Sequence, residues 1–236
     1  GHGYQAVLVE RLPKLGDADG DATLETVSVA AGEEYVDADT GQVLTAEEAV
    51  DDLPRLTVRF RIREGVTWQD GTPVTADDSV WSAELACDPE TSTDKALCGR
   101  TARYEKVDDR TVEWQGLPGY ADPTYYTNFY SPLPRHQLGS DGRRMDEMSA
   151  SEVAADEALT RRPYAYGPFS VDEWVEGDRI RLERNDGYWR SDEGLPVLEA
   201  VEVRFYDDPD EVLAALLDGD VDVVVRDSLD VVEVEG

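Results

Sequence analysis

Carboxylates are the side chains through which this sequence first suggests chemistry. Its 236 residues include 53 Asp and Glu against 22 Lys and Arg, which gives a formal net charge of −31. Adjacent pairs such as Asp77/Asp78 and Asp207/Asp208 are the residue types that acid–base hydrolysis uses. Both pairs lie where a helix is expected to begin, however, and there carboxylates cap free N–H groups. Capping explains them fully, and the sequence predicts no catalytic residue.

Two further features could bind a metal or exchange protons. His136 is the only histidine besides His2, which lies in residues 1–3, taken here as a cloning remnant. A catalytic His136 would need partners within hydrogen-bond reach, and the surrounding PLPRHQL is more typical of a turn. Residues 17–21, DADGD, resemble the start of a calcium loop, but Ala22 and Ser28 stand where an EF-hand requires glycine and glutamate. We predict no metal site and no cofactor.

An aromatic cluster is the best candidate for contact with a ligand. The cluster consists of the rings of Tyr120, Tyr125, Tyr126, Phe129 and Tyr130, together with the side-chain amide of Asn128. Flat rings with polar tips suit varied organic or peptide ligands, although the same rings could instead belong to the core. We predict that the ligand contacts are Tyr125, Tyr126, Asn128 and Tyr130.

The charge limits the partners of the protein. A net charge of −31 repels phosphate backbones, which excludes nucleic acid, and otherwise indicates a solvated acidic surface. No apolar run approaches the ~20 residues of a membrane span, and the opening GHGYQAVLVE has no signal-peptide pattern. We expect a mature or excised chain that folds as a globule.

A strand, a turn and a helix between residues 55 and 85 must position these candidates. Residues 55–63, RLTVRFRIR, alternate apolar and polar side chains, which is the period of a strand with one buried face. The DGTP that follows at residues 70–73 is typical of a tight turn. Thr75 then caps a helix predicted to run to about Cys87.

The remaining segments predict a mixed α/β or α+β fold. Short strands or hairpins are expected over residues 4–54, and a helix over 149–159. A last helix begins at Asp208-Pro209 and ends at Gly219. Further expectations are a strand at 111–114, a short helix at 124–130, a mobile loop at 139–148, and strands around Ile180, over Val201–Phe205 and over Val221–Val225.

Five motifs occur in a fixed order along the chain. The longest is IREGVTWQDGTPVTADDSV at residues 62–80. It is followed by YEKVDDRTV at 104–112, LPRH at 133–136, YGPF through ERNDGYW at 166–189, and LLDGDVDV at 216–223. This series resembles the family 5 extracytoplasmic solute-binding proteins, the oligopeptide, dipeptide and nickel receptors of ABC importers. The resemblance extends over about residues 12–224.

The resemblance implies a periplasmic-binding-protein-like lobe, with a mixed sheet flanked by helices. Residues 1–236 would form a single first lobe, with the second lobe and a returning C-terminal segment outside the chain. The implied function is that of a monomeric, non-enzymatic component that captures peptides or related small solutes. It would act outside the cytoplasmic membrane, as a periplasmic protein or a cell-surface lipoprotein, with the permease subunits of an ABC importer as partners.

Two other classes of function stay open at this point. A secreted carboxylate-dependent hydrolase would turn over a chromogenic glycoside, whereas a binding lobe would not. A calcium-dependent adhesion module would melt at a different temperature in the presence of a chelator.

Cys87 and Cys98 are the only cysteines, with no neighbouring His or Cys to complete a metal site. The exported family that the chain resembles implies a disulfide between them, which would tie the end of the first helix to the next segment. The alternative is a pair of buried thiols in a cytosolic protein.

We predict that salt raises the thermal midpoint of this protein. Its net charge of −31 makes the compact state repel itself, and ions screen that repulsion. Calorimetric melts between low salt and about 1 M NaCl, where the Debye length falls to about 3 Å, provide the measurement. A midpoint that stays flat or drops would show that the acidity does not destabilise the fold.

Overall fold

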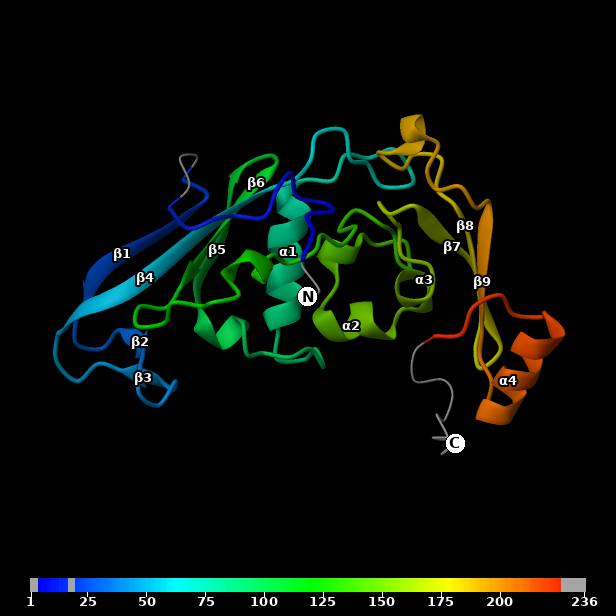
Figure 1. The fold of residues 1–236 in the computed structure, drawn as a ribbon. Helices are drawn as coiled ribbons and strands as arrows, with labels where there is room; N and C mark the ends of the chain where they lie inside the picture. The colour runs from blue at the N-terminus through cyan, green and yellow to red at the C-terminus, as the bar shows by residue number, and fades with distance from the viewer. Residues whose placement is uncertain (1–3, 17–19, 226–236) are drawn as a thin grey trace.

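A long central strand, β4 (Val50–Arg61), organises the N-terminal half of the structure. It pairs antiparallel with β1 (Ala22–Val29) on one side and with β6 (Thr111–Gly116) on the other. The outer strand β5 (Thr101–Asp108) completes a sheet in the order β1-β4-β6-β5. The computed structural model, drawn in Figure 1, describes residues 4–16 and 20–225.

The predicted alternation along β4 is confirmed, and it gives the sheet two different faces. Val58 and Phe60 of β4 and Trp114 of β6 are at most 1 % exposed and belong to one core cluster. Because successive side chains point to opposite sides of a strand, Arg59 lies on the other, solvent-facing side. The strand is longer than predicted, since it begins at Val50 and pairs with β1 from there.

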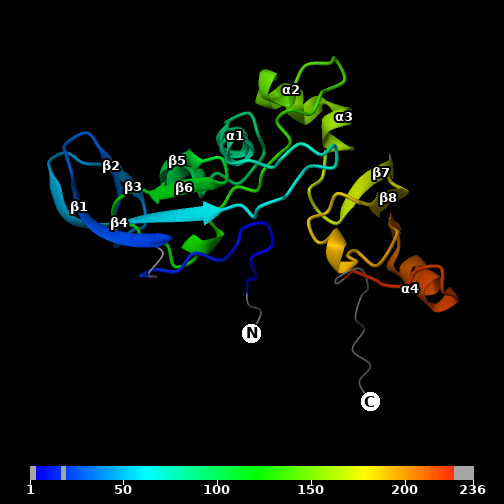
Figure 2. The same ribbon diagram turned by 90° about the horizontal axis from the view of Figure 1, so that it is seen from above.

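Helix α1 (Ala76–Cys87) packs against the apolar face of this sheet (Figures 1 and 2). Its predicted start is confirmed, because the Asp78 carboxylate accepts hydrogen bonds from the Thr75 N–H at 2.9 Å and the Thr75 hydroxyl at 3.1 Å. The helix also ends at Cys87, as predicted. Its buried positions are mostly small, and they are Ala76, Asp78, Ser79, Ser82 and Ala83. Small side chains let the helix approach the sheet closely.

The hairpin of β2 (Glu34–Val36) and β3 (Val43–Thr45) confirms the short strands expected before residue 54. It is attached to the end of the four-stranded sheet, where the Val36 N–H donates to the Pro118 carbonyl at 2.8 Å. Gly119 beside it has a φ of +96°, and a Cβ there would lie 2.0 Å from the Val36 carbonyl oxygen. Only glycine therefore fits this contact.

A second sheet forms in the C-terminal part, in the order β7 (Phe169–Val175), β8 (Arg179–Arg184) and β9 (Ala200–Arg204). Helix α4 (Pro209–Asp218) follows it and has the predicted ends. Asp208 caps its first turn by accepting from the Asp210 N–H at 2.8 Å. A left-handed glycine, with a φ of +79°, ends the helix at the predicted position.

The mixed α/β class is confirmed, but the expectation of a mixed sheet is wrong. Every ladder between the strands named above is antiparallel. The reason lies in the course of the chain after β4. After β4 the chain passes through helix α1 and returns at the edge of the sheet as β5, not directly beside β4. A tight turn then leads into β6, which lies between β4 and β5. Parallel strands are thus kept apart by an antiparallel one.

The single helix predicted over residues 149–159 is two short helices, α2 (Ala150–Ala155) and α3 (Glu157–Thr160). Asp156 between them has an extended ψ of 112°. Its carboxylate accepts from the Ala158 N–H at 2.8 Å, so it caps the second helix instead of continuing the first.

Two other local predictions are wrong. The helix expected at 124–130 is only a 3-10 turn over Tyr125–Thr127. Residues 221–225 form no strand, because no neighbouring strand pairs with them in the described part of the chain, and Val223 is 77 % exposed.

The loop expected at 139–148 is anchored by Met145, which is buried in a small core cluster.

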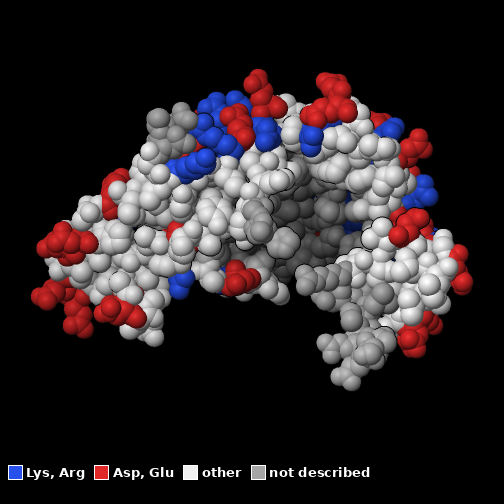
Figure 3. All heavy atoms as spheres, in the orientation of Figure 1, with Lys and Arg blue, Asp and Glu red and all other residues white. Residues whose placement is uncertain are grey.

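The two sheets lie at opposite ends of the molecule, with α2 and α3 between them at the back of the view in Figure 1, as Figure 2 shows from above. The space-filling view is hollowed between the two ends, and the hollow is lined mainly by uncharged residues (Figure 3). Charged side chains lie around its rim. Among the described residues, no helix has the length and apolar character needed to cross a membrane.

Candidate functional site

The predicted ligand-contact residues follow β6 in one loop, which Asp122 organises. One Asp122 carboxylate oxygen accepts from the Thr124 N–H at 2.7 Å and the Thr124 hydroxyl at 2.8 Å. The other oxygen accepts from the Asn128 side-chain amide at 2.9 Å. Asn128 is only 4 % exposed, so its side chain holds the loop in shape from inside.

Tyr130 lies in a hydrogen-bonded hub that joins the loop to α1 and β5. The buried Ser79 hydroxyl donates to the Tyr130 carbonyl at 2.6 Å and accepts from the Tyr104 hydroxyl at 2.7 Å. The Tyr104 oxygen in turn accepts from the Tyr130 N–H at 3.2 Å, and the two rings meet edge-on at 5.0 Å. Burial raises the pKa of both phenols above its ordinary value. Tyr130 thus packs the loop onto the helix.

Tyr125 and Tyr126 lie nearer the surface, beside the N-terminal segment. Their rings meet edge-on at 5.6 Å. The Tyr125 hydroxyl accepts from the Leu15 N–H at 2.9 Å, and the Tyr126 ring packs against Tyr4 at 5.4 Å. The structure therefore divides the four predicted contacts into this surface pair and two residues that support the loop. Tyr120 of the predicted cluster makes a separate cation–π contact.

A second aromatic group, which sequence reasoning did not identify as a site, joins the two ends of the molecule. The Trp68 ring packs edge-on against Tyr166 at 5.2 Å. Gln69 next to it donates its N–H to the Ala165 carbonyl at 2.8 Å, and its side-chain oxygen accepts from the Ala165 N–H at 3.1 Å. These contacts connect segments almost a hundred positions apart, which no local pattern in the sequence indicates.

Trp189 extends this junction from the C-terminal side. The Arg63 guanidinium lies 4.8 Å from the centroid of its ring, a cation–π contact across the junction. Trp189 and Tyr166 both pack on a core cluster that contains Trp68, which is 1 % exposed. Trp68 and Trp189 are therefore packing residues of this junction.

His136 contacts the same junction. Its Nε2 lies 3.0 Å from Asp70 Oδ2, and its ring centroid lies 6.1 Å from that of Trp68 and 5.7 Å from that of Tyr164. Partial burial opposes ionisation of Asp70, but hydrogen bonds from the Thr72 N–H and from His136 outweigh it. The pKa of Asp70 therefore lies below its ordinary value. The contact holds the DGTP turn against the aromatic rings.

One carboxylate of each predicted pair caps a helix. Asp78 is almost fully buried, where it caps α1 and lies 3.4 Å from the Arg135 Nε. Its neighbour Asp77 accepts from the Lys106 ammonium at 2.9 Å, and Asp208 caps α4.

The calcium-like segment lies only partly within the described residues. Asp17 and Asp19 are outside them, and Asp21 is paired with Arg11 at 2.6 Å. In residues 4–16 and 20–225, no three His, Cys, Asp or Glu side chains are grouped so that they could hold a metal ion.

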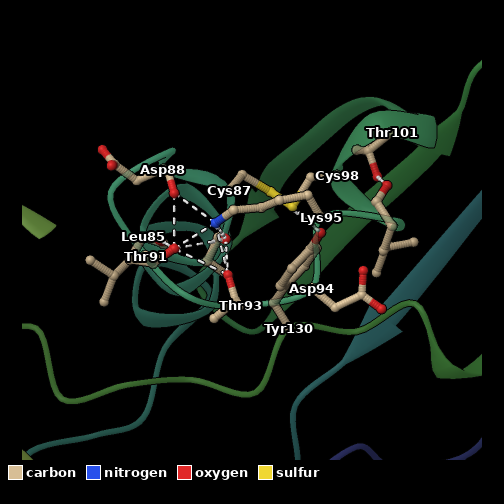
Figure 4. The surroundings of a disulfide bond; sticks show 12 residues. Leu85, Cys87, Asp88, Thr91, Thr93, Asp94, Lys95, Cys98, Thr101 and Tyr130 are labelled. Atoms are coloured by element: carbon tan, nitrogen blue, oxygen red, sulfur yellow. Dashed lines mark hydrogen bonds between the residues drawn. A yellow bond between two sulfur atoms is a disulfide. The ribbon is translucent and has the colours of Figure 1, made fainter. Parts of the chain in front are cut away.

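A disulfide joins Cys87 to Cys98, as the family resemblance implied (Figure 4). The two Cα atoms are 5.6 Å apart. The Tyr130 hydroxyl lies 3.5 Å from one sulfur and 3.4 Å from the other, so the disulfide adjoins the hub that supports the loop.

Lys95 closes the segment between the two cysteines (Figure 4). Its ammonium donates to the carbonyl oxygens of Ala86 and Asp88 at the end of α1, and to the hydroxyls of Thr91 and Thr93. A cation here suits the negative end of the helix dipole, since α1 has no basic residue in its last turn.

Solved structures of peptide-binding proteins share this fold. The oligopeptide-binding protein from Thermus thermophilus, complexed with a pentapeptide, matches 92% of this chain with a TM-score of 0.59 at 20% identity, over 36% of its own length. AppA from Bacillus subtilis, in complex with a nonapeptide, matches 92% of this chain with a TM-score of 0.58 at 23% identity, over 41% of its length. The fold is therefore that of the oligopeptide-binding proteins.

Residues 42–235 match the family described as bacterial extracellular solute-binding proteins, family 5 Middle, and the protein belongs to this family. The oligopeptide-binding protein AppA of Bacillus subtilis (strain 168) is 29% identical over 184 residues, which are 75% of this chain and 32% of AppA. Periplasmic OppA of Salmonella typhimurium (strain LT2) is 28% identical over 138 residues, or 55% of this chain and 25% of OppA. The chain thus spans about a third or less of these relatives.

Family membership confirms the resemblance drawn from the five motifs. It identifies an extracellular solute-binding protein and not an enzyme, which decides against the secreted hydrolase. It equally leaves the calcium-dependent adhesion module without support.

We predict that protein purified without reductant carries no free thiol. Alkylation and mass spectrometry should find neither Cys87 nor Cys98 labelled. A Cys87→Ser, Cys98→Ser variant should lose about 3 kcal/mol of unfolding free energy, because the crosslink restricts the unfolded chain. Two labelled thiols in the untreated protein would contradict this prediction.

We also predict a loss of stability above about pH 10 that depends on Tyr104. The folded-state pKa of this phenol is raised, so its contribution is fully present below the ordinary value of 10.0 and is lost as the pH rises towards the folded value. Tyr104→Phe should reduce this alkaline loss while costing about 1 kcal/mol at neutral pH through the lost hydrogen bonds. The measurement is urea unfolding at neutral pH and above pH 10, with Tyr35→Phe as the control. An alkaline loss of unchanged size in Tyr104→Phe would refute the assignment.

Proposed function

We propose that this protein captures peptides or related small solutes outside the cytoplasmic membrane and delivers them to an ABC importer. The observation that carries the proposal is the hollow between the two ends of the molecule, whose lining is mainly uncharged on a chain with a net charge of −31 (Figure 3). Ligand sites are concave and largely uncharged, with a few polar groups that fix orientation. A hollow of this kind suits the neutral backbone and varied side chains of a peptide.

The relatives support peptide as the ligand class. The Thermus thermophilus and Bacillus subtilis proteins were solved with a pentapeptide and a nonapeptide, respectively. Both share the fold of this chain over 92% of its residues. We extend their ligand class, but no particular peptide, to this protein.

Tyr126 is the side chain that we propose for direct contact with the ligand, with Tyr125 beside it. Both rings are half-buried, and Tyr125 packs on the core cluster on the same side of the four-stranded sheet as helix α1. The ring contact between Tyr4 and Tyr126 connects the tyrosine pair to the N-terminal segment. Asn128 and Tyr130 would act through the shape of the loop, since they are held by Asp122 and by the Ser79 hub.

Capture in this family of proteins is proposed to use closure of two lobes around the solute. Residues 1–236 would form a single first lobe, and a monomer suffices for this role. We place the protein in the periplasm or, as a lipoprotein, at the cell surface, where permease subunits of the importer would receive the solute. A half-site with an uncharged lining, on a chain with a net charge of −31, gives no favourable surface for nucleic acid.

We predict that the 236-residue chain binds peptides weakly or not at all, and that any residual binding depends on the tyrosine pair. A ligand buried between two lobes finds only part of its contacts on one of them, while the cost of ordering remains. Titration calorimetry with a mixed peptide library should give at best a micromolar or weaker affinity. Tyr126→Ala should abolish the remaining heat.

Tyr35→Ala serves as the matched control, because Tyr35 is a half-buried tyrosine of the β2–β3 hairpin. It should leave the titration unchanged. Sub-micromolar binding that survives both Tyr126→Ala and Tyr130→Ala would show that a complete site exists elsewhere in the chain.

A further inference from the structure

The solvent-facing side of the four-stranded sheet has a concave surface that the proposed function does not use. It forms a cavity of about 350 Å³, lined by residues from all four strands. The lining residues with polar side chains include Thr23, Arg55, Thr57, Arg59, Arg103 and Glu113. A second cavity of about 340 Å³ adjoins it, and Arg59 lines both.

Arg59 is the residue that connects the two cavities. Its Nε donates to the Glu113 carboxylate at 2.8 Å, which fixes the guanidinium in place. Its two terminal nitrogens have no partner among the described residues, and the side chain is 53 % exposed. With Nε engaged, the edge formed by the two terminal nitrogens stays open in the described part of the chain, and such an edge can bind a carboxylate through paired hydrogen bonds.

The side chains around Arg59 include more arginines than glutamates. The 7 %-exposed Glu113 is shared by Arg59 and Arg103, whose Nη2 donates to its second oxygen at 3.0 Å. Arg55 donates a terminal nitrogen to Glu25 at 3.1 Å, but its Nε is buried and has no partner in the described part of the chain. Three arginines therefore face two glutamates in the first cavity.

The second cavity has the same balance. Arg11, Arg61 and the shared Arg59 face Glu10 and Asp21 there, so the five arginines of the two cavities face four carboxylates. This local excess of arginine stands against a net charge of −31 for the chain. Figure 3 shows basic side chains gathered above β4 and β6, whereas the β2–β3 end carries acidic ones. An anionic ligand repelled by the rest of the surface would be accepted at this place.

We infer that the outer face of the sheet is a second binding site, which takes an elongated, carboxylate-bearing ligand such as an acidic peptide segment. Arg59 anchors one carboxylate at the point where the cavities meet, and the Arg55 guanidinium adds positive charge to the lining of the first cavity. The site is separate from the hollow, because Arg59 and the tyrosine loop lie on opposite faces of the sheet: Tyr125 packs on the core cluster that contains Val58 and Phe60.

The test is titration calorimetry of the whole chain with acetylated, amidated tetraglutamate at about 20 mM ionic strength, where screening is weak. Arg59→Gln should weaken binding by roughly tenfold, the loss expected for one charge-assisted pair. Arg55→Gln should also weaken it, and this variant leaves both partners of Glu113 in place if Arg59→Gln disturbs the fold. Arg181→Gln is the matched control, because Arg181 is 47 % exposed and paired with Asp172 on the other sheet.

The expected result is binding that both cavity variants weaken and that Arg181→Gln and Tyr126→Ala leave unchanged. Tetraglutamine should not bind, and free glutamate should bind more weakly than the peptide because it reaches only one cavity. Absence of tetraglutamate binding, equal binding of tetraglutamine, or insensitivity to both cavity variants would overturn the inference. An equal loss in Tyr126→Ala would place the peptide in the hollow and would also overturn it.

Discussion

The strict alternation of side chains along β4 is the constraint on which the rest of the N-terminal half depends. Val58 and Phe60 enter the core only if Arg59 faces solvent, and a slip by one residue would exchange the two sets. Because β4 is paired on both edges, the register that buries Phe60 beside Val112 also sets Arg59 opposite Glu113. The apolar core and the arginine-lined face are therefore consequences of a single register.

The position of the tyrosine loop depends on the same sheet. Helix α1 packs on the apolar face through small residues, and one of them, Ser79, bonds to both Tyr104 of β5 and the backbone of Tyr130. The loop is thus held by both a helix and a strand, while Tyr125 and Tyr126 stay near the surface. A rigid support beneath adaptable rings is what a receptor for varied solutes requires.

Local signals explain which elements could be predicted from the sequence. The segments of β4, α1 and α4 carry such signals in their own sequences. The start of α1 at Thr75 and the bonds that the Asp78 carboxylate accepts from Thr75 are confirmed. The split of α2 from α3 needed knowledge of where the Asp156 side chain bonds. The supporting roles of Asn128 and Tyr130, the junction at Trp68 and the cavities around Arg59 all depend on contacts between distant segments. Spacing along the chain carries no information on those contacts.

The enclosure of Lys95 has a consequence for chemical labelling. The chain has lysine only at positions 14, 95 and 106. Lys95 is engaged by backbone carbonyls and threonine hydroxyls, and Lys106 by Asp77 and Asp109, whose hydrogen bonds raise its pKa and keep it protonated. Acylating reagents attack the neutral amine, so among the three lysines the exposed Lys14 is the first that lysine-directed dyes or surfaces would reach. Covalent coupling through lysine would therefore attach the protein in one orientation, by its N-terminal segment.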